Sequence, residues 1–145
     1  FLIKFYTSNM NYGKTGNINS YNGLELYLYD NEKIGSLFMT NFDVSVDIDI
    51  NTSEILEKSL NVPFDRFNSV FIFKFNIDDK YRRMGYGTKL LEEAIKFCIS
   101  IKINYVYLNC DLLNERAKKF YDKFGFIEIG KNKKDFLLYY KIPPS

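Results

Sequence analysis

The sequence predicts one α/β domain, in which helices pack on a mixed sheet. Three observations carry this prediction: short apolar runs with strand-like alternation, longer stretches with helical periodicity, and a strand, helix, strand order over residues 70–110. Such a crossover joins two parallel strands in the right-handed sense. We expect residues 1–145 to form a single domain, because domains usually take roughly 100–200 residues.

The first part of the chain predicts strands around one loop. Residues 1–8 are apolar and aromatic enough for a strand, whereas residues 9–23 are rich in Asn, Gly and Ser and predict a loop. Residues 24–30 alternate with a period of two, a turn follows at residues 31–33, and residues 34–42 return. This pattern is typical of an antiparallel hairpin.

A change of period marks the middle of the chain. Residues 44–50 still alternate, and they either extend the preceding strand or form another. Asn51, followed three residues later by Glu54, has the N-cap pattern of a short helix. Residues 69–77 are so apolar that we expect a central strand covered on both faces. Residues 88–101 carry the broad apolar stripe of a helix.

The last third predicts a strand, a helix and a closing hairpin. Residues 105–110 form the strand, and Asn114 is placed to cap a helix that Gly125 ends. Residues 126–130 and 135–142 lie on either side of a Lys-Asn-Lys-Lys turn and are expected to pair as two strands. The order of elements is therefore that of a mixed sheet.

The absence of histidine excludes several kinds of active site. Without an imidazole, the chain cannot form a Ser-His-Asp triad, a Cys-His nucleophile pair or an HExxH zinc site. Cys98 and Cys110 are too few to cage a zinc ion and stand in apolar runs, so we expect buried, reduced thiols and no metal site. Reduced thiols indicate a cytoplasmic protein. Proton transfer must then rely on Asp, Glu, Tyr, Lys, Cys or water.

The charges are distributed unevenly between the two halves. Residues 1–70 carry five basic and nine acidic side chains, a net of −4, and residues 71–145 carry fifteen basic and nine acidic ones, a net of +6. This favours an anionic ligand in the second half and a cationic one in the first. The basic residues form no long stripe, so no nucleic-acid partner is expected. No apolar run reaches the roughly 18 residues that span a bilayer, and no signal-peptide pattern opens the chain, so no membrane partner is expected.

The most informative segment, residues 81–88, joins the central strand to a helix. Gly85 and Gly87 let the backbone turn tightly and bring successive N–H groups against a ligand. The following helix adds unpaired N–H groups and the positive end of its dipole, which suits a pyrophosphate, and Arg82 and Arg83 add charge. Taken alone, the pattern is equally compatible with a plain tight turn.

Two other phosphate motifs fail at this loop. A dinucleotide fingerprint needs Gly or Ala three positions after Gly87, where the chain has Leu90. A P-loop needs Gly-Lys-Ser/Thr, whereas Gly87 is followed by Thr and then Lys. The loop therefore belongs to neither of these two classes of nucleotide site.

Two motifs together carry a resemblance to a known family. They are Arg82-x-x-Gly85-x-Gly87 and Asn114-x-x-Ala117-x-x-x-Tyr121-x-x-x-Gly125-Phe126. The combination resembles the GNAT family of acetyl-CoA-dependent N-acetyltransferases over residues 69–142, the acetyl-CoA-binding half. The resemblance implies a mostly antiparallel sheet with helices on both faces and a central parallel pair splayed around the cofactor. Residues 1–68 are then a variable, acceptor-side half, and its helices are reduced because residues 9–23 lack helical periodicity.

The resemblance also implies a role for each matched residue that binds the cofactor. The backbone at Phe75 and Ile77 would bind the pantetheine arm, with the Ile77 amide as a candidate for the thioester oxyanion. Asn114, with Ala117 in the same motif, would contact the arm from the other side. The pyrophosphate would be held by Arg82 and by the amides of Arg83, Met84, Gly85, Tyr86, Gly87 and Thr88. Lys118 and Lys119 either reach the adenosine phosphates or are simply solvated.

Tyr121 is the catalytic residue that the resemblance implies. Its phenol would protonate the departing thiolate, since a phenol with a pKa of about 10 is a credible donor to a thiol of about 8.5. The other interpretation is structural, because Tyr121 shares an apolar stripe with Phe120 and Phe124.

The motifs leave the acceptor and the base open. The resemblance implies direct transfer of an acetyl group from acetyl-CoA to a primary amine of a small molecule or peptide, without a metal, by a monomer or homodimer. Family members that place a Glu in the strand before the loop have it near Phe71, and this strand contains no acid. Candidates for the base are water relayed to Asp78, Asp79 or Asp111, or one of Asp43, Asp47 and Asp49. The alternatives to an enzyme are a noncatalytic acyl-CoA-binding or regulatory module, and a structural domain with an incidental glycine turn.

Overall fold

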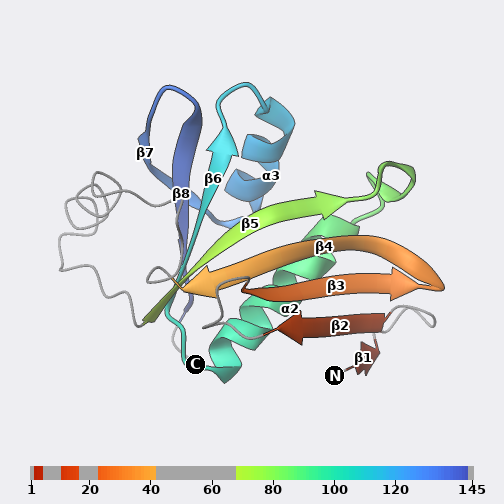
Figure 1. Cartoon of the computed structure of the whole chain (residues 1–145). Helices are drawn as coiled ribbons and strands as arrows, with labels where there is room; N and C mark the ends of the chain where they lie inside the picture. The colour runs from red at the N-terminus through yellow and green to blue at the C-terminus, as the bar shows by residue number, and fades with distance from the viewer. Residues whose placement is uncertain (1, 5–10, 17–22, 42–67, 144–145) are drawn as a thin grey trace.

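The structure, a computed structural model, describes residues 2–4, 11–16, 23–41 and 68–143 (Figure 1). Over these residues the chain forms one eight-stranded sheet and two α-helices. In chain order the elements are β1 (Leu2–Lys4), β2 (Asn11–Gly16), β3 (Leu24–Asp30), β4 (Glu32–Asn41), β5 (Ser69–Ile77), the 3₁₀ turn η2 (Asp79–Tyr81), α2 (Tyr86–Ser100), β6 (Tyr105–Asp111), α3 (Glu115–Phe124), β7 (Ile127–Lys131) and β8 (Asp135–Lys141).

The sheet is mixed and mostly antiparallel, as the sequence predicts. Its strands lie in the order β1-β2-β3-β4-β5-β6-β8-β7. Every neighbouring pair is antiparallel except β5 and β6, which α2 connects as a parallel pair. The crossover predicted over residues 70–110 is confirmed, and a helix fills it because parallel strands need a connection long enough to return to the same end of the sheet.

The loop predicted for residues 9–23 is wrong at its centre, where β2 runs antiparallel to β3. The two strands pair over the whole of β2. Tyr12 is fully buried, and the missing side chain of Gly13 leaves room for the Tyr27 ring on the paired strand. Asn and Gly favour turns locally, but pairing with the apolar β3 satisfies the backbone of β2, and strand formation depends strongly on such neighbours.

Two element boundaries differ slightly from the predictions. The hairpin of β3 and β4 turns at Asn31 alone, whose φ of 62° is left-handed, a conformation that Asn tolerates better than most residues. The helix predicted from residue 88 begins at Tyr86, because Gly85 takes a left-handed φ of 83° and serves as its N-cap. The strand expected at residues 44–50 and the helix expected at Asn51 lie outside the described residues.

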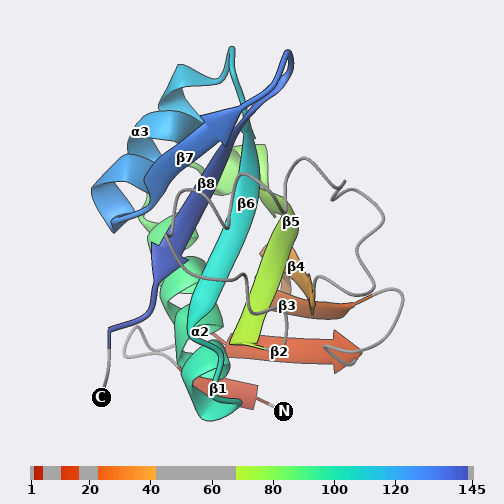
Figure 2. The ribbon, with the colours of Figure 1, turned by 90° about the vertical axis from the view of Figure 1, so that its left-hand side faces the viewer.

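Both described helices pack on one face of the sheet. Their side chains enter the main hydrophobic cluster, as Leu90, Leu91, Ala94, Ile95 and Cys98 of α2 and Ala117, Phe120, Tyr121 and Phe124 of α3. Figure 2 shows α2 passing behind β6. On the opposite face, Phe71, Tyr107 and Leu137 form a second, smaller buried cluster. A helix on that face stays a prediction, and neither described helix is long and apolar enough to cross a membrane.

The two cysteines are buried, unpaired thiols, as the sequence predicts. Burial raises the pKa of the Cys98 thiol to about 12. Burial also raises the pKa of the Cys110 thiol. Because only the thiolate is a good nucleophile, both side chains are unreactive at neutral pH and serve as small apolar groups.

The parallel strands β5 and β6 pair over their first residues and then separate (Figure 1). Their register stops at Ile72 opposite Leu108. On its other side, β5 shifts register against β4 between residues 73 and 76, where Lys74 has a left-handed φ of 51°. A bulge of this kind bends a strand. The end of β5 therefore turns away from β6, which confirms the splayed pair that the family resemblance implies.

Gly35 lies where β4 meets the end of β5. A Cβ at this position would lie 2.8 Å from the carbonyl oxygen of Asn76 and 3.2 Å from the Cα of Ile77, closer than side-chain carbons normally approach backbone. We expect Gly35→Ala to lower the free energy of unfolding by about 1–3 kcal/mol, as overpacked positions do. Urea denaturation measures this change. An unchanged midpoint in the variant would show that the two strands separate here without cost.

Candidate functional site

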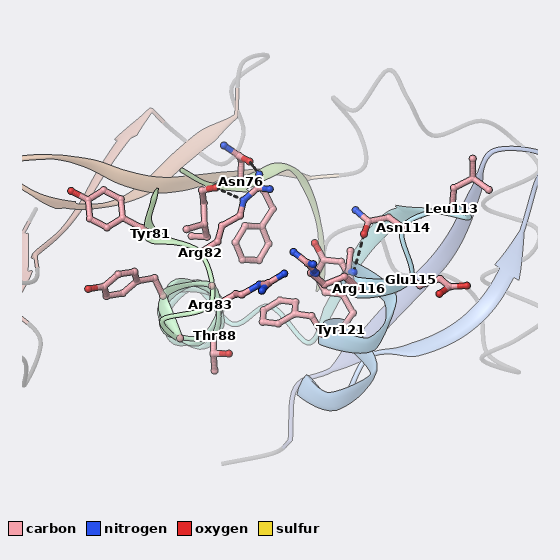
Figure 3. A pocket seen from close by; sticks show the side chains of 17 residues that line it. Asn76, Tyr81, Arg82, Arg83, Thr88, Leu113, Asn114, Glu115, Arg116 and Tyr121 are labelled. Atoms are coloured by element: carbon pink, nitrogen blue, oxygen red, sulfur yellow. Dashed lines mark hydrogen bonds between the residues drawn. The ribbon is translucent and has the colours of Figure 1, made fainter. Parts of the chain in front are cut away.

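A cavity of about 690 Å³, the first cavity, opens at the end of β5 (Figure 3). Its walls are the last residues of β5, the loop before α2, the first turn of α2 and the first half of α3. The structure brings together here most of the residues that the motifs single out, namely Phe75, Ile77, Arg82, Arg83, Gly85, Tyr86, Gly87, Thr88, Asn114, Ala117 and Tyr121. Two segments far apart in the sequence thus form one site.

One expected residue does not line the first cavity, and several unexpected ones do. Met84 lies outside it and is 59% exposed. The role assigned to the Met84 amide stays a prediction. Sequence reasoning missed six lining residues, Asn76, Tyr81, Leu113, Glu115, Arg116 and Phe120. Most of them occupy variable positions within or beside the two motifs, where residue type carries no signal.

The loop before α2 has a backbone suited to an anion. Arg83 and Gly85 both have left-handed φ angles, 65° and 83°. Alternation of left- and right-handed residues turns successive N–H groups toward one point. The first amides of α2 have no acceptor within the helix, and no side chain caps them. These donors, together with the helix dipole, make the loop a site for a phosphate-like group.

Arg82 holds this loop to the end of β5. Its Nε donates a hydrogen bond to the Ile77 carbonyl oxygen at 3.0 Å, and its guanidinium donates to the Asn76 side chain at 3.2 Å. It also forms an ion pair with Asp79 at 3.1 Å. The guanidinium of Arg82 is therefore engaged within the chain, so its main contribution is to position the loop.

Arg83 and Arg116 extend toward one another from opposite walls of the first cavity (Figure 3). Arg83 belongs to the loop before α2, and Arg116 to the first turn of α3. Neither guanidinium forms an ion pair with another described residue. Two unpaired cations that converge on one space repel each other until an anion lies between them.

The two lysines that follow on α3 do not line the first cavity. Lys118 forms ion pairs with Asp122 at 3.0 Å and with Glu128 at 3.6 Å, and its ammonium lies over the Phe136 ring. Lys119 is exposed to solvent. Of these three basic residues of α3, only Arg116 lines the first cavity.

The tip of the β3–β4 hairpin supports the same loop. The Tyr81 hydroxyl donates a hydrogen bond to the Glu32 carboxylate, which also pairs with Lys80 at 2.6 Å. Lys80 and then Tyr81 hold the pKa of Glu32 below its usual value. The Tyr81 ring packs edge-on against Tyr86 at 6.0 Å between centroids. The front half of the chain thus helps to position the loop.

Tyr121 lies at the inner end of the first cavity. Its ring packs against Phe75 at 6.3 Å, Phe120 at 5.3 Å and Phe126 at 5.6 Å between centroids, which satisfies the structural interpretation. Its hydroxyl makes no hydrogen bond with a described residue. Burial, with a smaller contribution from Cys110, raises the pKa of the phenol well above its usual value near 10. The side chain is therefore a core ring that carries a protonated hydroxyl.

A second cavity, of about 260 Å³, occupies the space between the separated ends of β5 and β6. It is lined by residues 72–75 of β5, residues 108–111 of β6, and by Asn114, Ala117 and Tyr121. The last three residues and Phe75 line both cavities. The two cavities therefore meet at these four residues.

The carboxylates that the sequence suggests as a base lie at different places in the fold, and only some of them can be placed. Asp79 pairs with Arg82, and neither Asp78 nor Asp79 lines a cavity. Asp111 lines the second cavity. Asp43, Asp47 and Asp49 lie outside the described residues. In the part of the chain that the structure covers, no three His, Cys, Asp or Glu side chains are placed to hold a metal ion.

The splayed parallel pair, with a glycine loop between β5 and α2, is the arrangement that the family resemblance implies. Comparison with known sequences agrees, since residues 22–126 match the Acetyltransferase (GNAT) family. The chain belongs to this family. This is the family that the two motifs indicate, and the match extends well beyond them toward the N-terminus.

Similar proteins share this family. The chain is 41% identical to N-alpha-acetyltransferase 50 of Danio rerio over 66 residues. These residues make up 45% of this chain and 38% of that protein. The chain thus matches less than two-fifths of the length of this relative. Over 61 residues it is 34% identical to N-alpha-acetyltransferase 30 of Homo sapiens, 42% of this chain and 17% of that protein.

Solved structures confirm the fold. The structure of Ard1 from Thermoplasma volcanium superposes with a TM-score of 0.62 at 16% identity, over 83% of this chain and 71% of that one. The structure of the PaiA N-acetyltransferase from Thermoplasma acidophilum, solved in complex with coenzyme A, superposes with a TM-score of 0.60 at 19% identity. The superposition covers 81% of this chain and 59% of that one. At these identities the likeness concerns the fold alone.

Proposed function

We propose that the chain transfers an acetyl group from acetyl-CoA to the α-amine of a peptide or protein N-terminus. The observation that carries the proposal is the meeting of two cavities at Tyr121. One cavity ends at an anion-binding loop and the other is free of it, as a donor with phosphates and a separate acceptor require. The relatives named as N-alpha-acetyltransferases support the choice of an α-amine.

The residues of the first cavity fit acetyl-CoA. The donor supplies an acetyl group activated as a thioester. The amides of the loop and the guanidinium of Arg83 suit its pyrophosphate, and Arg116 on the facing wall suits a further phosphate oxygen. The exposed backbone where β5 leaves β6 suits the amides of the pantetheine arm, because strand edges have unpaired donors and acceptors.

Tyr121 then stands at the reacting end. Because burial keeps its phenol protonated at neutral pH, Tyr121 can donate to the sulfur as the thiolate leaves. A backbone amide near Phe75 or Ile77 would stabilise the negative charge on the thioester oxygen, since the last residues of β5 have no partner on β6. The acceptor nitrogen attacks from the second cavity, so no covalent enzyme intermediate is needed.

An α-amine suits a site with few acids better than a lysine side chain does. An α-amino group has a pKa of about 7.7–8.0, so about one molecule in ten is free base at pH 7. A lysine amine with a pKa of about 10.4 is free base in only about one molecule in a few thousand. The site therefore needs far less help from a base when the acceptor is an α-amine.

The test is an acceptor screen with purified protein. Coenzyme A release from acetyl-CoA is measured with peptides that differ in their first two residues, and mass spectrometry locates the acetyl group. The control peptides have a blocked N-terminus and one internal Lys. We expect release with the free N-termini and none with the blocked peptides.

A noncatalytic acyl-CoA-binding module is the second candidate, because the β5 strand contains no carboxylate. The same preparation distinguishes the two. A ligand at about 100 times its dissociation constant adds roughly 2.7 kcal/mol of stability, which a thermal shift detects. A shift with acetyl-CoA but no release with any acceptor would favour the module and contradict the enzyme.

A further inference from the structure

We infer that Asp111 is the catalytic base that takes the proton from the acceptor amine. This inference rests on the proposed function and names the group that the motifs leave open. Asp111 is the last residue of β6, and it lines the second cavity opposite the bulged stretch of β5. It lies on the acceptor side of the junction at Tyr121, where the attacking nitrogen must lose its proton.

The alternation of β6 places Asp111 on the correct face. Cys110 is buried and packs into the main cluster under the helices, whereas Asn109 and Asp111 are exposed. Successive side chains of a strand point to opposite faces. Asp111 therefore faces away from the helices and the phosphate-binding loop. A carboxylate there meets the amine without repelling the phosphates of the donor.

Elimination among the other groups of the second cavity leaves Asp111. The described titratable residues that line it are Lys74, Cys110, Asp111 and Tyr121. The ammonium of Lys74 has no free electron pair, and burial raises the pKa values of Cys110 and Tyr121, so both stay protonated at neutral pH. The carboxylate of Asp111 is the remaining group of this set with oxygen lone pairs that can accept a proton.

The carboxylate of Asp111 is held in place but is not neutralised. Its Oδ1 accepts a hydrogen bond from the Leu113 amide at 2.8 Å, and no described cation pairs with it. Asp135 lies directly opposite on β8, with Lys134 beside it in the chain, and Lys74 lies across the cavity on β5. The carboxylate of Asp135 offsets the charge of these lysines, so an ammonium group can approach Asp111.

The balanced step involves two bonds and three protons. The acceptor nitrogen forms a bond to the acetyl carbon, and the bond between that carbon and the sulfur of coenzyme A breaks. The nitrogen of an ammonium acceptor loses two protons: the first goes to Asp111, directly or through one water, before the attack, and the second goes to solvent as the amide forms. The sulfur receives a proton from Tyr121. Proton exchange with solvent then restores both side chains. The products are the N-acetylated acceptor and the free thiol of coenzyme A.

The experiment compares the full chain with Asp111→Asn, using the peptide that gives the highest rate in the acceptor screen. Asparagine keeps the oxygen that accepts from Leu113 but cannot take a proton. We expect kcat/KM at pH 7 to fall by about 10²-fold or more, the usual loss when a general base is removed. The loss should shrink toward pH 9.5, because the α-amine is then free base without help. Coenzyme A affinity, measured by calorimetry, should not change.

Two controls make the outcome decisive. Asp135→Asn removes a charge from the same face without removing a group from the cavity, and it should change kcat/KM less than about threefold, as a change of steering alone does. Asp111→Ala, if folded as judged by circular dichroism, should regain rate with added formate. Equal losses in Asp111→Asn and Asp135→Asn, or full activity of Asp111→Asn, overturn this inference alone. A wild-type protein that acetylates no acceptor overturns the proposed function and this inference with it.

Discussion

Replacement of Tyr121 by Phe is expected to lower kcat by about 10²- to 10⁴-fold, the usual contribution of a positioned proton donor. The ring contacts with Phe75, Phe120 and Phe126 remain in the variant, so the fold and the first cavity are kept. Only the hydroxyl at the junction of the two cavities is lost. Initial rates at saturating acetyl-CoA measure the change, and calorimetry should give an unchanged affinity for coenzyme A.

Tyr81→Phe is the matched control for this prediction. Tyr81 also lines the first cavity, but its hydroxyl donates to Glu32 on the hairpin tip and not to the reacting end. We expect this variant to weaken cofactor binding modestly through the loop and to leave kcat nearly unchanged. Equal rates for wild type and Tyr121→Phe would show that Tyr121 is only a core ring.

Removal of both unpaired arginines should reduce affinity for coenzyme A by about 10²- to 10⁴-fold. A hydrogen bond to a charged group contributes about 1.5–3 kcal/mol, or about 10- to 150-fold in affinity for each of Arg83→Ala and Arg116→Ala. Anion binding relieves the repulsion between the two cations, and each single variant already loses that gain, so the combined effect is smaller than the product. Calorimetric titration at two salt concentrations measures both the loss and its expected salt dependence.

A comparison of coenzyme A with 3′-dephospho-coenzyme A tests which phosphate Arg116 contacts. If Arg116 binds the 3′-phosphate, its replacement weakens coenzyme A but not 3′-dephospho-coenzyme A. If it binds the pyrophosphate, both ligands weaken equally. Lys119→Ala is the control, since this exposed lysine does not line the cavity. Unchanged affinity in Arg83→Ala and Arg116→Ala would mean that the backbone amides of the loop bind the phosphates alone.

Prediction from sequence succeeded where one segment carries its own signal. The helix that became α2 has a stripe of apolar residues at helical spacing, and Asn114 accepts a hydrogen bond from the Ala117 amide at 3.1 Å, as an N-cap does. Gly85 takes the left-handed conformation that a tight loop requires. Each of these features depends on residues within one or two turns of each other.

Prediction failed where a distant segment decides the outcome. β2 has a turn-like composition, and it becomes a strand because β3 supplies its hydrogen-bonding partner. Arg82 and Arg83 are adjacent and chemically identical, yet the end of β5 engages one and leaves the other facing a cavity. Arg116 carries no motif signal, and its role depends on the loop that α3 happens to face.

The sequence by itself therefore predicted most of the elements, the glycine turn before α2 and the family of this protein, because periodicity, capping and glycine conformation are local properties. Only the tertiary structure decided which charged groups face a cavity. The bulge at Lys74 bends β5 away from β6, and the space between them brings Asp111 and Tyr121 to one cavity from separate elements. A site of this kind arises from the packing of distant segments, and no single stretch of the chain encodes it.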